Sequence, residues 1–229
     1  MRHDVSQHSD QRGFTLIELL VVVVLVATLA ALLLPLLAQA RATALNRGCV
    51  SNLENIGQSL QLYTKDHHGL LPGPLWMGQP FEYTERSTNA MAYYLTEYLV
   101  TPEPSALPAL SKAFLCPAYE QFAPRSLLSA ERVSLIANQD LDVAPGEGRK
   151  VPPFGYPGRY GKQASQPLDL ETIKLFGSPS DFWGLTDADR KNSPSENNPW
   201  FKQLPVKPVH GNYRNVLYLD GRVRSKRVR

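Results

Sequence analysis

The chain has 229 residues and a mass of 25.5 kDa, which fits one domain, or one domain with an appendage. Its apolar share of 43% fits neither global disorder nor a membrane protein with many spans. A net charge of +3 is too small for a surface that binds nucleic acid throughout, and two cysteines exclude a disulfide-dense scaffold and a four-cysteine zinc site. Of 19 prolines only Pro35 precedes residue 70, so the first third of the chain differs from the rest.

Residues 19–38 form a run of 20 positions without a charged residue, and all of them except Thr28 and Pro35 are apolar. As a helix, a run of this length spans about 30 Å, the thickness of the hydrocarbon core of a bilayer. A cleavable secretory signal has a shorter apolar region of about 7–15 residues, followed by a small-residue cleavage site. The run therefore predicts a retained membrane helix.

One carboxylate, that of Glu18, lies at the start of this apolar helix. Such a charge costs about 2.5–3.5 kcal/mol on insertion scales, so a positively charged partner is expected nearby. Cleavage after Gly13 would supply one, because it leaves a free α-amino group on Phe14 of the same or a neighbouring subunit. The alternative is an uncleaved signal anchor whose Glu18 reaches the membrane interface.

The sequence GFTLIELLVVVVLVATLAALLLP, which begins at Gly13, resembles the N-terminus of bacterial type IV prepilins and type II secretion pseudopilins. The resemblance implies that residues 1–13 are a cytoplasmic leader, that prepilin peptidase cuts the Gly13–Phe14 bond, and that Phe14 is then N-methylated. It implies that Glu18 pairs with the N-terminus of a neighbouring subunit during assembly. Pro35 lies where such helices often carry a proline, which kinks or locally melts them.

The resemblance also implies a location and partners. The chain would first be a single-pass protein of the inner membrane with its globular domain in the periplasm, and later part of a periplasmic or extracellular filament. Its expected partners are prepilin peptidase, the inner membrane, and copies of itself or other pilins.

Beyond the uncharged run, the apolar pattern becomes periodic. Seven residues spaced by three or four positions share one helix face: Ala42, Leu45, Cys49, Leu53, Ile56, Leu60 and Tyr63. Gly69 suits a left-handed cap, so one helix is predicted from 14 to 66. Residues 14–38 would be its transmembrane and assembly half, and residues 39–68 its amphipathic continuation. A helix of two such parts is the architecture of a pilin.

Residues 69–229 are numerous enough for a core of their own and are predicted to form a globular domain. The predicted elements are a short helix near 91–99, strands at 112–116, 132–137, 171–176 and 181–186, and a loop at 144–168. With the long helix they predict a pilin-like α+β fold, in which the helix packs on an antiparallel sheet. The chain contains no phosphate-loop, dinucleotide, nucleophile-elbow or zinc-protease motif, so we expect neither an enzyme nor a cofactor.

The C-terminal sequence predicts a β-hairpin whose turn contains Asp220 and Gly221, a pair that type I′ turns favour. His210 precedes Asp220 by ten positions. This H-x9-D-G pattern resembles the C-terminal signature of a large bacterial subgroup of prepilin-like proteins, in which a Cys-Pro pair, here Cys116-Pro117, is also frequent. We interpret the signature as structural, with Asp220 in the turn and His210 bonded to a loop. The alternative is a signal-anchored periplasmic domain with a site at His210 and Asp220.

Two further groups of residues leave alternatives open. Cys49 and Cys116 form either a disulfide, since an even pair can oxidise outside the cytoplasm, or two buried free thiols. Asp187, Asp189 and Asp220 are a weak candidate calcium set. Their spacing is not that of a calcium loop, so no metal is expected.

The last eight residues, RVRSKRVR, contain five basic residues and no acid. We interpret them as an edge strand whose cations prevent edge-to-edge pairing. The alternative is a patch for DNA or another anionic polymer, which would suit a minor pilin that binds DNA or a surface at a filament tip. Nucleic acid is not an expected partner, because no aromatic residues interleave with the cations to stack bases. The principal prediction is therefore a structural subunit of a type IV pilus-like filament or a type II secretion pseudopilus.

Overall fold

The computed structural model describes residues 15–121, 132–144, 146–159, 163–193 and 200–228. The predicted leader and the Gly13–Phe14 bond lie outside these ranges. The chain divides into two units, Met1–Arg41 and Ala42–Arg229, and helix α1, Leu16–Asp66, contributes residues to both.

In the first unit, every residue from Thr15 to Arg41 is exposed. Within the described ranges, α1 is the one helix that is long and apolar enough to cross a membrane. The hydroxyl of Thr28 donates to the carbonyl of Leu25 at 2.8 Å, so this polar group of the apolar run is satisfied inside the helix. The helix continues through Pro35 without an interruption. The predicted kink at Pro35 stays a prediction.

In the second unit, one face of α1 is buried. Its buried residues are Cys49, Leu53, Ile56, Gly57, Ser59, Leu60, Tyr63 and Thr64. Five of the seven residues predicted to share a face are among them, Leu45 packs partly against the core, and Ala42 is exposed. The helix ends at Asp66, and both His68 and Gly69 have positive φ angles, 54° and 88°. The predicted cap therefore includes His68 as well as Gly69.

A five-stranded antiparallel sheet with strand order β1-β4-β7-β8-β9 forms the centre of this unit. Its strands are β1 Gly78–Pro80, β4 Val133–Ala137, β7 Trp183–Asp187, β8 Tyr213–Tyr218 and β9 Val223–Arg227. Two small sheets pair β2 Glu82–Tyr83 with β3 Ala109–Leu110, and β5 Leu141–Ala144 with β6 Arg149–Val151. The short helices are α2 Met91–Tyr94 and α3 Leu170–Lys174, and 3₁₀ turns form at Lys112–Phe114, Tyr119–Gln121 and Phe201–Gln203. One long N-terminal helix packed on an antiparallel sheet confirms the predicted pilin-like α+β class.

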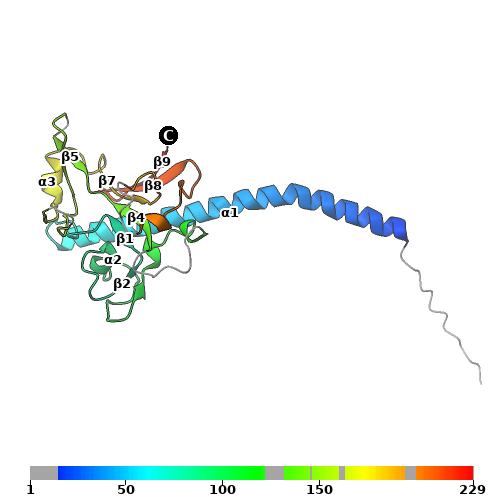
Figure 1. Cartoon of the computed structure of the whole chain (residues 1–229), viewed down its shortest axis with the longest axis horizontal. Coiled ribbons are helices and arrows are strands. Elements are labelled where there is room, and N and C mark those ends of the chain that lie inside the picture. Colours follow the sequence, from blue (N-terminus) through cyan, green and yellow to red (C-terminus); the bar gives the residue numbers. More distant parts are fainter. Residues whose placement is uncertain (1–14, 122–131, 145, 160–162, 194–199, 229) are drawn as a thin grey trace, which may run out of the picture. The chain divides into compact units, whose positions relative to one another are not determined.

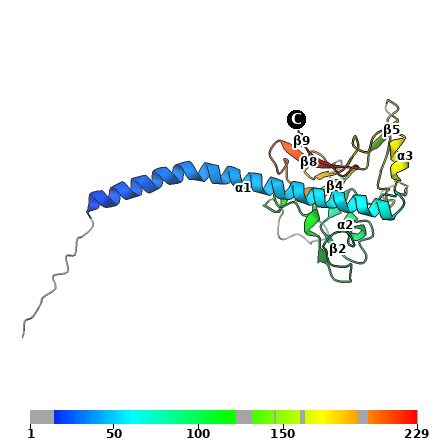
Figure 2. The same cartoon turned by 180° about the vertical axis from the view of Figure 1, so that it is seen from behind.

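The buried part of α1 is covered from two sides. In both views it runs between the β8–β9 hairpin and a layer that contains α2 and β2 (Figure 1) (Figure 2). On the α2 side, the ring of Tyr63 meets the rings of Tyr94 and Tyr98 edge to face, with centroids 6.2 and 6.0 Å apart. On the sheet side, Gly57 lies against Leu217 of β8. The helix is therefore part of the core of this unit, which explains its periodic apolar pattern.

Two predicted strands are helical in the structure. Residues 112–116 contain a 3₁₀ turn, and residues 171–176 largely form α3. The side chain of Asp169 caps α3 by accepting from Thr172 N at 2.8 Å, and these hydrogen bonds lower the pKa of Asp169. The β-branched pair in this segment favoured a strand, but the cap decides its structure. Strands β4 and β7 lie where strands were predicted.

The C-terminal hairpin is present, but its turn differs from the predicted one. A type I′ turn needs positive φ at both central residues, whereas here Gly221 has φ of 83° and Asp220 has no positive φ. Gly221 N donates to Tyr218 O, and Tyr218 N donates to Arg222 O, both at 2.9 Å. These bonds define a three-residue loop that ends in a glycine bulge. Strand β9 contains most of the basic tail and lies at the edge of the sheet, as expected.

Candidate functional site

The first turn of α1 holds Glu18 against Thr15. Glu18 Oε2 accepts from Thr15 N at 2.9 Å and from Thr15 Oγ1 at 2.7 Å, and Glu18 N donates to Thr15 Oγ1 at 3.2 Å. This reciprocal arrangement is a capping box, which satisfies backbone donors at the start of the helix. The Thr-x-x-Glu pattern of this capping box is present in the sequence, but only an amino group was expected there as the partner of Glu18. The pairing of Glu18 with an amino group at Phe14 stays a prediction, because Phe14 lies outside the described residues.

The apolar side chains that follow form a continuous exposed surface. Leu32 and Leu37, for example, are 73% and 67% exposed. An exposed apolar surface of this extent marks a membrane or protein interface, because contact with water along so many side chains is unfavourable. The chain therefore has a surface that needs lipid, a protein partner, or both in turn.

A second cluster joins α1 to the sheet. Cys49 of α1 forms a disulfide with Cys116, which follows the 3₁₀ turn at Lys112–Phe114, and their Cα atoms lie 4.8 Å apart. Of the two states left open for these cysteines, the structure contains the disulfide. In the chain-entropy model, a link that closes a loop of 67 residues contributes about 4 kcal/mol to stability. The bridge therefore ties the helix to the loops of the sheet domain.

His210 and Asp187 lie beside this disulfide. His210 Nε2 is 3.5 Å from Cys116 Sγ and 3.4 Å from Asp187 Oδ2. Asp187 Oδ2 also accepts from Asn215 N at 2.7 Å. Burial raises the pKa of Asp187 to about 7 and lowers the pKa of His210 to about 4. Since the two groups are so close, we expect them to share one proton at mildly acidic pH.

The structure does not bring His210 and Asp220 together. They lie beyond opposite ends of β8, so a site that uses both does not form. Asp220 instead belongs to the hairpin turn, where its carboxylate accepts from Arg222 N at 3.1 Å. The interaction of His210 with Asp187 was not predicted. It has no signal in the sequence, because it depends on how β7 and the loop before β8 pack.

The candidate calcium set does not converge either. Asp189 is bound in two places by Arg214, with 2.6 Å from Oδ2 to Nε and 2.8 Å from Oδ1 to Nη2. This buried carboxylate therefore already has a cation as its partner. Asp187 faces His210, and Asp220 lies in the distant turn. The three acids do not form one calcium site.

The Asp-Gly turn of the signature contacts α1. Gln61 Nε2 donates to the carbonyl of Asp220 at 2.6 Å. A Cβ atom on Gly57 would lie only 2.7 Å from the carbonyl oxygen of Gly221, so the turn approaches the helix backbone closely. Gly221 has positive φ, and its own Cβ would collide with Gln61. Gly57 is therefore required by the close approach of the turn to the helix, and Gly221 by its positive φ.

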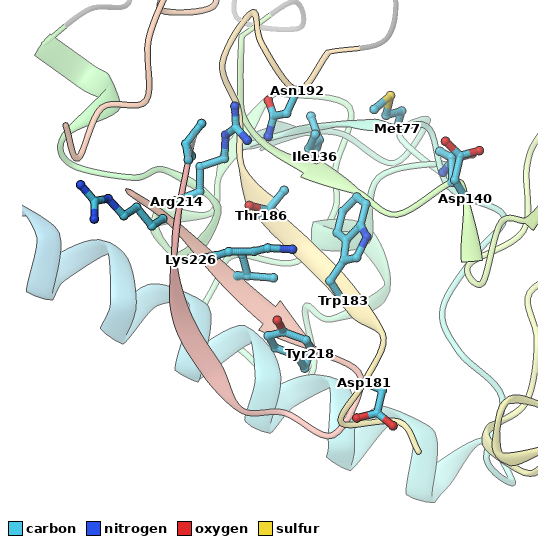
Figure 3. A pocket seen from close by; sticks show the side chains of 14 residues that line it. Met77, Ile136, Asp140, Asp181, Trp183, Thr186, Asn192, Arg214, Tyr218 and Lys226 are labelled. Carbon is cyan, nitrogen blue, oxygen red and sulfur yellow. The ribbon is translucent and has the colours of Figure 1, made fainter. Parts of the chain in front are cut away.

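The other face of the sheet has a cavity of about 430 Å³. Since Asn215 and Leu217 of β8 point toward α1, the alternating side chains Arg214, Val216 and Tyr218 point away from it and line the cavity. Figure 3 shows Lys226, Trp183, Thr186, Asp140 and Asp181 around the same space. The cavity thus carries aromatic groups and both signs of charge.

The sheet brings aromatic rings next to the basic tail. No aromatic residue interleaves with the basic tail along the chain, but the sheet places the ring of Tyr218 beneath Arg224, 5.0 Å from its guanidinium carbon. Trp183 of β7 lines the cavity together with Lys226. Strand pairing therefore supplies the aromatic neighbours that the linear sequence lacks. Binding of DNA or a surface at this face stays a prediction.

Residues 8–34 match the prokaryotic N-terminal methylation motif. This match supports a type IV pilin-like protein. The motif covers the Gly13–Phe14 junction, Glu18 and most of the apolar run, and it implies processing by a prepilin peptidase and assembly with other pilins. With the apolar helix, it fits a single-pass membrane-anchored protein. No curated protein and no solved structure matches this pilin-like chain.

Proposed function

We propose that this protein is a structural subunit of a type IV pilus-like filament or a type II secretion pseudopilus. Prepilin peptidase removes residues 1–13, Phe14 is methylated, and the subunit polymerises through residues 14–41. The observation that carries the proposal is the methylation motif at the start of a helix whose apolar side chains are all exposed as far as Arg41. Lipid covers this surface before assembly, and the helices of other subunits cover it afterwards.

Within this proposal, the two units have separate tasks. The apolar part of α1 supplies the energy of assembly, since its side chains leave lipid for packing against other helices. Glu18 sets the register by pairing with the N-terminal amine of a neighbour. The unit from Ala42 onward lies in the periplasm and then on the filament surface. No catalytic step is assigned to it.

Processing is the first test of this proposal. The chain is co-expressed with a prepilin peptidase, and its intact mass and N-terminal sequence are measured. Loss of residues 1–13 together with one added methyl group on Phe14 is the expected result. A membrane-bound chain that still begins at Met1 would contradict the proposal and favour an uncleaved signal anchor.

Assembly is tested with Glu18→Ala, for which Glu54→Ala is a matched control, because Glu54 is an exposed glutamate on the same helix. We expect Glu18→Ala to reduce recovery in sheared filaments at least about tenfold, the effect of losing a desolvated ion pair. Glu54→Ala should assemble normally. Thr15→Ala removes the capping partner but leaves the carboxylate, so normal assembly of this variant assigns the effect to charge pairing. Equal assembly of all three variants would contradict the proposed role of Glu18 in assembly.

A further inference from the structure

We propose that the reduced form of this protein binds one zinc ion through Cys49, Cys116, His210 and Asp187. These four residues come from α1, the loop after the Lys112–Phe114 turn, the loop before β8, and the end of β7. The ligand atoms of the two cysteines and His210 all lie within 4.8 Å of one another. Two thiolates, an imidazole and a carboxylate are the donor types that zinc takes in tetrahedral sites.

Two distances in the oxidised structure already match edges of a zinc tetrahedron. With zinc bonds of about 2.3 Å to sulfur and about 2.1 Å to nitrogen and oxygen, a tetrahedral N–S edge is about 3.6 Å and an N–O edge about 3.4 Å. The observed separations are 3.5 Å between His210 Nε2 and Cys116 Sγ, and 3.4 Å between His210 Nε2 and Asp187 Oδ2. Once the disulfide is broken, the two sulfur atoms must separate to the S–S edge of about 3.8 Å, and the side chains of Cys49 and Asp187 must turn toward the ion.

A second observation points to a missing cation. The Asp187 side chain is 3% exposed, yet its Oδ1 atom has no hydrogen-bond partner among the described residues. A buried carboxylate oxygen without a partner is costly, and a metal ion held by this carboxylate through Oδ2 would also lie close to Oδ1 and offset that cost. Asn215 N already holds Oδ2 at 2.7 Å, so the carboxylate is oriented by a backbone group, as metal ligands commonly are.

The two states of the cluster exclude each other. A dithiol reductant transfers two electrons and two protons, so it becomes a disulfide while Cys49 and Cys116 become thiols. Zinc binding then releases the two thiol protons to solvent, and both sulfurs become ligands. The disulfide and the zinc ion both connect α1 to the sheet domain. The zinc ion would therefore replace the disulfide as the cross-link under reducing conditions.

The test uses the full chain in detergent micelles, in its oxidised form and after reduction by a phosphine. The phosphine reduces the disulfide to two thiols and becomes a phosphine oxide, whose oxygen atom comes from water. Each form is incubated with zinc, separated from free metal, and analysed for zinc content. We expect about one zinc ion per reduced chain and only background for the oxidised chain. Cobalt should give a thiolate charge-transfer band and the visible bands of a tetrahedral site with the reduced chain alone. A reduced, folded chain without bound zinc would overturn the proposal.

Two variants separate this site from adventitious thiol binding. His210→Ala should weaken zinc binding by at least about 100-fold. Loss of a residue that only supports a metal ligand costs up to about 100-fold, and loss of the ligand itself should cost no less. His68→Ala is the matched control, because His68 is exposed at the end of α1, and it should bind like the original. Equal affinity of both variants would overturn the proposal. If reduction alone unfolds the chain, zinc must restore the native near-ultraviolet dichroism, and failure to restore it also counts against the site.

Discussion

The two parts of α1 share one helix but differ in what surrounds them. Up to Arg41 every described residue is exposed, whereas from Cys49 to Thr64 one face of the helix is buried in the core of the second unit. The sequence shows the difference in advance: the first part is apolar on all sides, and the second part is apolar at intervals of three and four. A helix that is apolar all round needs lipid or other helices around it, and a helix with an apolar stripe needs one folded partner.

The comparison shows that one helix can have two separate roles, one in the folded core of the second unit and one in membrane insertion or assembly. The second unit has its own buried core, to which α1 contributes Leu53, Ile56 and Leu60. The first part adds nothing to that core, because its residues are exposed. Changes in the two parts should therefore affect different measurements, stability for one and membrane insertion or assembly for the other.

The largest effect is expected for Leu60→Ala. Leu60 is 2% exposed, and truncation of a buried leucine costs about 2–5 kcal/mol through lost burial and the cavity left behind. Leu62→Ala is the matched control, because Leu62 is 50% exposed on the same turn of the helix. Urea unfolding of the second unit, followed by tyrosine fluorescence in the full chain, measures the difference. Equal unfolding midpoints for the two variants would contradict the burial of this face.

The converse change is Leu29→Asp in the first part. A carboxylate near the middle of a membrane helix costs about 3 kcal/mol on insertion scales, so membrane recovery should fall roughly 100-fold. Leu62→Asp places the same charge in the second part and should leave membrane recovery unchanged. Fractionation of cell membranes followed by quantitative blotting provides the measurement. If both variants remain in the membrane, the first part is not the span.

A smaller effect is expected for Gly57→Ala. Alanine normally stabilises a helix interior relative to glycine by about 0.5–1 kcal/mol, but here its Cβ would meet the Gly221 carbonyl oxygen at 2.7 Å. Since that atom belongs to the backbone, we expect a net loss of about 1–2 kcal/mol in the free energy of unfolding. Gln58→Ala, at an exposed neighbouring position, is the control and should change stability little. A stabilised Gly57→Ala chain would show that the turn can move away.

The smallest effect concerns pH and again belongs to the second unit. Burial raises the pKa of Tyr119 to about 12, so the folded chain keeps a proton that the unfolded chain loses above pH 10. Stability should therefore fall as pH rises from 10 toward 12, by about 1 kcal/mol at pH 11. Tyr119→Phe removes this contribution, so its unfolding midpoint should decline less over that window. Parallel curves for the two chains would contradict a buried, neutral Tyr119.

The elements with local signals could be predicted from the sequence. The long helix, strands β4 and β7, and the C-terminal hairpin each have a hydrophobic period or turn residues that tertiary packing does not override. Residues 171–176 could not be assigned correctly from propensity alone, since a single capping residue, Asp169, outweighed the β-branched pair. The turn at Asp220 was predicted as a turn but with the wrong geometry, because the sequence does not specify the loop length.

The candidate site residues likewise divide into those with a local sequence signal and those without one. The junction at Gly13 and the carboxylate of Glu18 are read from consecutive residues, so a motif suffices to find them. The contacts of His210 join elements far apart in the chain, with Cys116 at a separation of 94 residues. Such contacts are set by sheet order and strand register, which no local pattern specifies.

Strand β8 is fastened to α1 near both of its ends, and this limits how the signature can change in length. Asn215 Nδ2 donates to Asn46 Oδ1 at 2.9 Å, and the turn after β8 meets Gln61, about four helical turns farther along α1. One residue inserted between these contacts would rotate every following side chain of β8 to the opposite face. Leu217 would leave the core, and Tyr218 would turn toward the helix. The spacing from Asn215 to Asp220, the second half of the signature, is therefore fixed by these two contacts with α1, and we expect related chains to vary in length in the surrounding loops before they vary within it.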